Sequence, residues 1–82
     1  MSTSVNLKPV SGKALRFEER KFFVVLEDDR EIGVPYSWFP RLAKATPEQL
    51  RNWRFIGQGQ GIHWEEIDED ISIMALLFPT AE

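Results

Sequence analysis

The sequence predicts a small α+β domain: a meander of three strands, then two short helices, a short hairpin and a C-terminal helical turn. Three observations carry this prediction. Apolar and polar residues alternate in the first half of the chain, and short polar breaks separate the alternating runs. Two segments with helix-starting residues and prolines follow. A glycine-rich turn then separates two short apolar runs near the C-terminus.

The chain has 82 residues, enough for one domain, and 43% of them are hydrophobic, which is enough for a packed core. We expect residues 10–80 to form this domain and residues 1–9 to be a flexible tail. There is no cysteine, which excludes disulfides, cysteine zinc sites and thiol nucleophiles and fits a reducing compartment. Without a secretion signal or a run of apolar residues long enough to span a membrane, we expect a cytoplasmic protein with no membrane partner.

The first half of the chain predicts three antiparallel strands. Residues 14–18 alternate, with Leu15 and Phe17 on one side, and residues 31–34 alternate again. Between them, residues 22–27 are aromatic and β-branched with no polar face, which is typical of a central strand. Because one face of that strand would lack cover within so small a chain, we expect a second copy or another protein to cover it.

The middle of the chain predicts two short helices. Ser37 is a suitable N-cap for a helix over residues 38–45, and Pro40 would lie in its first turn, where a missing N–H has no helical partner. Thr46 opens the run T-P-E-Q, a capping box with proline at the first helical position, and predicts a helix over residues 47–53.

The last part predicts a hairpin and a helical turn. Residues 54–56 and 62–64 would be its two strands, joined by the glycine-rich turn. The acidic run from Glu65 to Asp70 would be a connector, after which Ser72 caps a helix over residues 73–78 that Pro79 ends.

Four runs resemble the bacterial family known as domain of unknown function 2442 (DUF2442). They are A-L-R-F-E-E, V-P-Y-S-W-F-P-R-L-A-K-A-T-P-E-Q, G-Q-G-Q-G-I-H-W and D-E-D-I-S-I-M-A-L-L, and the resemblance covers residues 10–78. It implies a small α+β domain, found alone or joined to a helix-turn-helix segment, and often one half of a two-protein operon of toxin–antitoxin type. This chain ends at Glu82 without such a segment, so we expect no DNA-binding role to carry over. The resemblance assigns no catalytic residues.

The glycine-rich turn and the acidic run do not fit cofactor or metal sites. A phosphate loop needs Lys-Ser or Lys-Thr and a helix after its last glycine, whereas Ile62-His63-Trp64 follows here. The acidic run lacks the glycine and the ligand spacing of a calcium loop, because Ile67 and Ile71 interrupt it. We therefore expect no bound cofactor and no metal.

The single histidine does not by itself predict catalysis. In a strand, Glu65 would lie on the same side as His63, so the two can pair. A general base also needs a nucleophile, and the serines occupy tail, turn or cap positions. We therefore expect no catalytic residues and a protein that is not an enzyme.

The function that we expect is a non-enzymatic protein–protein interaction module, whose partner is a cognate small protein or a second copy in a homodimer. The family resemblance implies the antitoxin-like half of a two-protein operon. An acidic edge with Trp64 or Trp38 as its anchor would form the contact surface. The alternative is a nucleic-acid-binding accessory protein that uses Arg41, Arg51 and Arg54, although a net charge of −3 weighs against it. The candidate partner surface consists of Trp38, Arg41, His63, Trp64, Glu65, Glu66, Asp68, Glu69 and Asp70.

Overall fold

A computed structural model describes residues 10–78 of the chain. The predicted tail and Pro79 lie outside this range. In chain order the elements are β1 (Gly12–Phe17), β2 (Lys21–Leu26), β3 (Glu31–Pro35), the 3₁₀ helix η1 (Tyr36–Trp38), α1 (Pro40–Ala43), α2 (Pro47–Leu50), β4 (Trp53–Ile56), β5 (Gly61–Trp64), β6 (Glu69–Ser72) and α3 (Ile73–Leu77).

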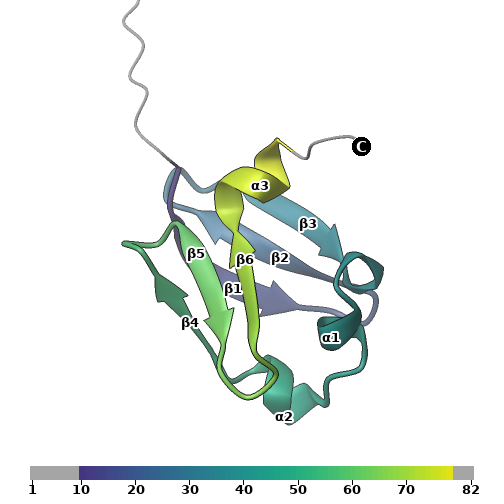
Figure 1. Cartoon of the computed structure of the whole chain (residues 1–82). Helices are drawn as coiled ribbons and strands as arrows, with labels where there is room; N and C mark the ends of the chain where they lie inside the picture. The colour runs from purple at the N-terminus through teal and green to yellow at the C-terminus, as the bar shows by residue number, and fades with distance from the viewer. Residues whose placement is uncertain (1–9, 79–82) are drawn as a thin grey trace, which may run out of the picture.

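The strands form two antiparallel sheets, each a three-stranded meander, with orders β1-β2-β3 and β4-β5-β6. The sheets lie one over the other, and the short helices close the sides (Figure 1). Side chains from both sheets, from α1 and from α3 make one core. At its centre the rings of Phe22 and Trp64 meet edge to face, with centroids 5.9 Å apart. The α+β class is therefore confirmed.

The first sheet follows the predicted alternation. Phe22, Val24 and Leu26 of β2 are buried against the second sheet, which covers this face. Phe23 points to the opposite face, where the Arg16 guanidinium lies 4.2 Å and the Lys21 ammonium 5.8 Å from its ring centroid. The chain's own cations thus cover part of the face for which the sequence suggested a partner.

The second sheet is larger than the predicted hairpin. The expectation of a plain connector between Glu65 and Ser72 was wrong over its last part, because residues 69–72 form β6 and pair with β5. Ile71 points into the core and is only 4% exposed. Asp68 has a positive φ of 57°, within the tight turn that reverses the chain between β5 and β6. Acidic side chains on the other positions hide this strand from a hydrophobic-pattern reading.

The two middle helices are shorter than predicted. The first is split into η1 and α1, and η1 begins after Pro35 with no side-chain cap, so the prediction of Ser37 as an N-cap was wrong. Pro40 is the first residue of α1, where it fits because its missing N–H would have no helical partner. The capping box at Thr46 is present, but α2 ends at Leu50 because Trp53 belongs to β4.

The turn between β4 and β5 ties the two sheets together. Gly59 has a positive φ of 84°, and its carbonyl accepts a 2.7 Å hydrogen bond from the N–H of Gly12 at the start of β1. The Ser11 hydroxyl donates to the carbonyl of Gln58 at 3.2 Å. The glycine-rich run is thus a structural turn, as the sequence predicted. Within residues 10–78, no helix is long and apolar enough to cross a membrane.

Candidate functional site

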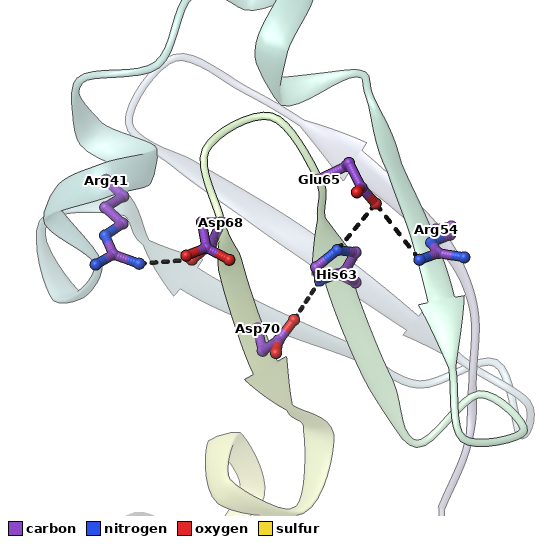
Figure 2. Close-up of polar contacts among 6 residues, drawn as sticks. All are labelled: Arg41, Arg54, His63, Glu65, Asp68 and Asp70. Atoms are coloured by element: carbon purple, nitrogen blue, oxygen red, sulfur yellow. Dashed lines mark hydrogen bonds and ion pairs between the residues drawn. The ribbon is translucent and has the colours of Figure 1, made fainter.

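A row of ionisable side chains crosses the outer face of the second sheet. In the strand register Arg54 of β4 lies opposite His63 of β5, and His63 lies opposite Asp70 of β6. Glu65, just after β5, reaches back over the same face. Figure 2 shows the row with His63 between the two carboxylates. The sequence predicted the pairing of His63 with Glu65 but not the contact with Asp70.

Both ring nitrogens of His63 contact carboxylates. Nδ1 makes a short hydrogen bond with Asp70, and Nε2 lies 3.2 Å from an oxygen of Glu65, which also lies 3.5 Å from Arg54. The hydrogen bond from Asp70 raises the pKa of His63 above its ordinary value of 6.5; partial desolvation opposes this rise, and Glu65 adds to it. In the charged form of His63 both nitrogens donate, which matches the carboxylate that lies at each of them.

This arrangement holds strands together. Because both nitrogens of His63 are directed at carboxylates, the ring is positioned to link β5 to β6, not to remove a proton from a hydroxyl. Among residues 10–78 no group of three or more His, Asp or Glu side chains has the geometry to hold a metal ion. The row therefore fixes β6, the strand at the edge of the sheet.

Within residues 10–78, no strand pairs with the edge of β6 that faces away from β5. The N–H of Ile73 donates to the carbonyl of Gln60 at 3.0 Å, which continues the β5–β6 register by one residue. Hydrogen-bonded and non-hydrogen-bonded pairs alternate along antiparallel strands, so Ile71 bonds to β5, while Asp70 turns its N–H and C=O groups outward and Ser72 its N–H group. The C=O of Ser72, the N-cap of α3, begins the hydrogen bonding of that helix instead. Two residues of β6 thus present donors and acceptors at the sheet edge.

A groove of about 490 Å³ runs along this edge. Trp38 and Phe39 form one wall, and Ala75 and Leu76 of α3 form the other. Trp38 is 56% exposed, an unusual position for so large an apolar side chain. We call this feature the β6 groove; its lining residues are Trp38, Phe39, Asp70, Ile71, Ser72, Ala75 and Leu76.

The predicted surface residues fall into three groups. Trp38 and Asp70 line the β6 groove. Trp64 is fully buried, and its indole N–H donates to the carbonyl of Leu50 at 3.0 Å, so the prediction of Trp64 as a contact anchor was wrong. Its strand position shares a face with Ile62, and that face is the core. The remaining six form the rim around the loop between β5 and β6: Arg41, His63, Glu65, Glu66, Asp68 and Glu69.

The rim is held by hydrogen bonds from neighbouring elements. Arg41 of α1 donates to the backbone carbonyl of Asp68 at 2.5 Å, as Figure 2 shows for the two residues. Gln49 of α2 donates to Glu66 at 3.2 Å. The Asp68 side chain is exposed, whereas Glu69 is half-buried. The acids thus form one connected edge, with Asp70 at the groove.

Sequence reasoning missed the groove's second wall and its floor. Ser72 was identified only as a helix cap, a role that it has, since its hydroxyl accepts from the N–H of Ala75 at 3.3 Å. The only alternation there is that of Asp70, Ile71, Ser72 and Ile73, a weak signal for a strand because Ile73 already begins α3.

A second cavity, of about 590 Å³, lies between the end of β1 and the helices α1 and α2. Phe17, Tyr36, Leu42 and Leu50 supply most of its apolar lining, and Arg51 lies at its rim. The Tyr36 hydroxyl is already bonded to the carbonyl of Glu18 at 2.8 Å. This cavity lies apart from the acidic edge.

Two solved structures are similar to the chain. A crystal structure of a protein of unknown function from Rhodospirillum rubrum has a TM-score of 0.74 and 28% sequence identity, and the match covers 85% of this chain and 87% of that one. A solution NMR structure of an uncharacterised protein from Chromobacterium violaceum has a TM-score of 0.71 and 28% identity, covering 82% of this chain and 63% of that one.

No curated protein matches the chain. A family model described as "Protein of unknown function (DUF2442)" matches residues 13–82, nearly the whole chain. The resemblance noted in the sequence is thereby confirmed, and the chain belongs to the DUF2442 family.

Proposed function

We propose that this protein is a non-enzymatic interaction module that binds a partner protein at the β6 groove and the acidic rim beside it. The observation that carries the proposal is the exposed Trp38, which forms a wall of a groove whose floor is an unpaired strand edge. Tryptophan is among the residues most enriched in the energetic centres of protein interfaces. An acidic rim around an apolar centre matches the usual layout of such an interface.

The charge of the rim favours a basic partner. Five carboxylates lie in the stretch from Glu65 to Asp70, and the two guanidiniums that contact it, those of Arg41 and Arg54, leave an excess of negative charge. Such an excess steers a positively charged surface toward the groove and raises the association rate. A cognate small protein from a two-protein operon, as in toxin–antitoxin pairs, is the form of partner that the family resemblance suggests.

Affinity capture followed by reconstitution tests this proposal. The tagged chain is used to capture proteins from cells, the captured protein is identified by mass spectrometry, and its affinity is then measured with purified components. Trp38→Ala is expected to weaken binding by about tenfold or more, as for other central interface tryptophans. Phe78→Ala is the matched control, because Phe78 is 69% exposed and does not line the groove. An equal loss of affinity in both variants, or no loss in either, contradicts the proposed surface.

Nucleic-acid recognition is less well supported. Arg41 is bonded to the carbonyl of Asp68 and Arg54 lies beside Glu65, while Arg51 lies at the other cavity. Phosphate binding depends on cations gathered on one surface. The three arginines lie on different surfaces, and two of them, Arg41 and Arg54, contact residues of the acidic rim.

A further inference from the structure

We propose that the partner binds by strand addition: an extended segment with alternating apolar and basic residues lies in the β6 groove and becomes the fourth strand of the second sheet. This inference rests on the proposed function and specifies its mode. It assigns the backbone of Asp70 and Ser72 as the hydrogen-bonding edge and the Trp38–Leu76 gap as the side-chain pocket.

The backbone geometry supports addition of an antiparallel strand. Asp70 and Ser72 are two residues apart, and the Ile73–Gln60 hydrogen bond fixes the register in which Asp70 directs its N–H and C=O groups, and Ser72 its N–H group, away from β5. The residue opposite Asp70 in an added antiparallel strand would exchange two hydrogen bonds with it, and the residue opposite Ser72 would accept one from the Ser72 N–H. The edge therefore offers three hydrogen bonds over three residues.

The side chains on the two faces of β6 define what the added segment must carry. Asp70 points to the outer face, and 67% of its side chain is exposed, so a lysine or arginine opposite it would form a favourable cross-strand pair. Ile71 points inward, and a residue opposite it would enter the gap between Trp38 and Leu76, where an apolar side chain fits. Ser72 points outward and accepts a polar neighbour. Read from its N-terminus, the segment is polar, apolar, basic.

A hollow on the outer face extends the recognition surface. It lies over Gly61 of β5, between Ile56 and Ser72, with a volume of about 400 Å³. In the strand register Gly61 lies opposite Ile56 on β4 and opposite Ser72 on β6, and because glycine has no side chain, the space between these two residues stays open. A long basic side chain opposite Ser72 can lay its aliphatic part across this hollow.

The groove favours a single segment over a second copy of this chain. The β6 edge is the floor of the groove, and Trp38 and α3 supply its two walls. Two such floors cannot approach each other, because the walls of both copies would meet first. A single extended strand has no walls and can enter. The acidic rim also repels an identical rim and attracts a basic segment.

Short peptides test this mode without knowledge of the natural partner. The probe is an acetylated and amidated octapeptide that alternates lysine and valine, and the observation is the amide NMR spectrum of the ¹⁵N-labelled protein. The expected result is a set of shifts centred on Asp70, Ser72 and Trp38, with slower hydrogen exchange at the Asp70 and Ser72 amides. A peptide that alternates glutamate and valine is the charge control. Its affinity is expected to be lower than that of the lysine peptide by about tenfold or more.

Backbone methylation of the probe separates strand addition from simple charge attraction. In the proposed register the lysine N–H groups face β6 and the valine N–H groups point away. Methylation of the lysine backbone nitrogens is therefore expected to weaken binding by about tenfold or more, because it removes the hydrogen bond donated to the Asp70 carbonyl and places methyl groups against β6. Methylation of the valine nitrogens is expected to leave binding within about twofold, since those groups have no partner in the added strand.

The outcomes are distinct. Equal effects of both methylations, or shifts that lie away from β6, overturn strand addition, and so does concentration-dependent dimerisation that Trp38→Ala abolishes. If a reconstituted partner depends on Trp38 while the peptides show no such pattern, the proposed function stands and the strand mode fails. If the peptides bind as described but Trp38→Ala leaves the partner's affinity unchanged, the groove is a strand acceptor and the proposed partner surface is wrong.

Discussion

At the level of single residues, His63 is the side chain on which the arrangement of the second sheet depends. It lies on the middle strand, 18% of its side chain is exposed, and its ring links Asp70 on β6 to Glu65 beyond β5. Asp70 belongs both to this link and to the groove. The protonation of one ring therefore influences the strand that forms the groove's floor.

The stability of the protein is expected to depend on pH through His63. Its pKa is raised in the folded state, so the proton is bound more tightly there than in the unfolded chain. The stabilisation is fully present below the ordinary value of 6.5 and is lost as the pH rises through the raised pKa. In urea unfolding measured from below pH 6.5 upward, the free energy of unfolding is expected to fall as the pH rises, and His63→Gln is expected to make this fall smaller. A fall of equal size in the variant contradicts the assignment.

The partner that raises the pKa of His63 can be identified by NMR titration of its ring protons. Asp70→Asn removes the first cause of the shift and is expected to lower the pKa of His63. Asp68→Asn is the matched control, because asparagine tolerates the positive φ at that position and the Asp68 side chain makes no contact with the ring. Equal pKa values in the two variants would show that Asp70 is not the cause.

At the level of helices and strands, the short helices depend on their caps. Thr46 accepts from the N–H of Gln49 at 3.1 Å, and Gln49 returns a contact to the N–H of Thr46 at 3.0 Å. Thr46→Ala is expected to lower the free energy of unfolding by about 1 kcal/mol in urea denaturation. Ser37→Ala is the control, since η1 has no side-chain cap, and it should have little effect. A comparable loss in both variants contradicts the role of the capping box.

The sequence indicated the strands of the first sheet and the capping box because both are local patterns. Alternation at Leu15 and Phe17, and T-P-E-Q at residues 46–49, need no knowledge of the rest of the chain. The ends of helices were wrong where tertiary pairing decides. Trp53 could extend a helix from Pro47, but it pairs with Trp64 across two strands instead.

The groove could not be predicted for the same reason. Strand β6 carries one core residue, Ile71, among acids, and it exists because β5 pairs with it and His63 binds Asp70. The acidic edge was visible in the sequence, but the burial of Trp64 was not, since a tryptophan next to acids can point either way along a strand. Contacts between residues far apart in the chain decide both features.

At the level of the whole molecule, the two sheets meet where β1 begins. Gly12 is buried there, and a Cβ atom would lie 2.7 Å from Phe55 and 2.8 Å from Ile73. Gly12→Ala is expected to lower the free energy of unfolding by about 1–3 kcal/mol, because the added methyl group overpacks the junction of both sheets and α3. Gly33→Ala, whose Cβ would contact the outward ring of Phe23 at 3.0 Å, is the control with the smaller expected loss. Thermal unfolding of both variants checks this, and equal losses would contradict the junction's importance.

The acidic rim belongs to the whole surface and is expected to act through long-range attraction. The double variant Glu66→Gln and Asp68→Asn removes two charges while keeping an acceptor at each position. The association rate constant of the reconstituted partner is expected to be lower for this variant than for the wild type, and to depend less on salt concentration. Glu19→Gln with Glu48→Gln is the control, because both residues are exposed outside the rim. An equal change of the association rate in both double variants would show that the rim does not attract the partner.

Site-specific photocrosslinking tests most directly whether the partner binds at the β6 groove. A benzophenone amino acid is placed at Trp38, and in a second protein at Phe23, which points outward from the opposite sheet. After irradiation with the purified partner, we expect a covalent complex from the Trp38 position and none above background from the Phe23 position. Crosslinking from Phe23 with none from Trp38 would contradict the claim and move the interface to the outer face of the first sheet.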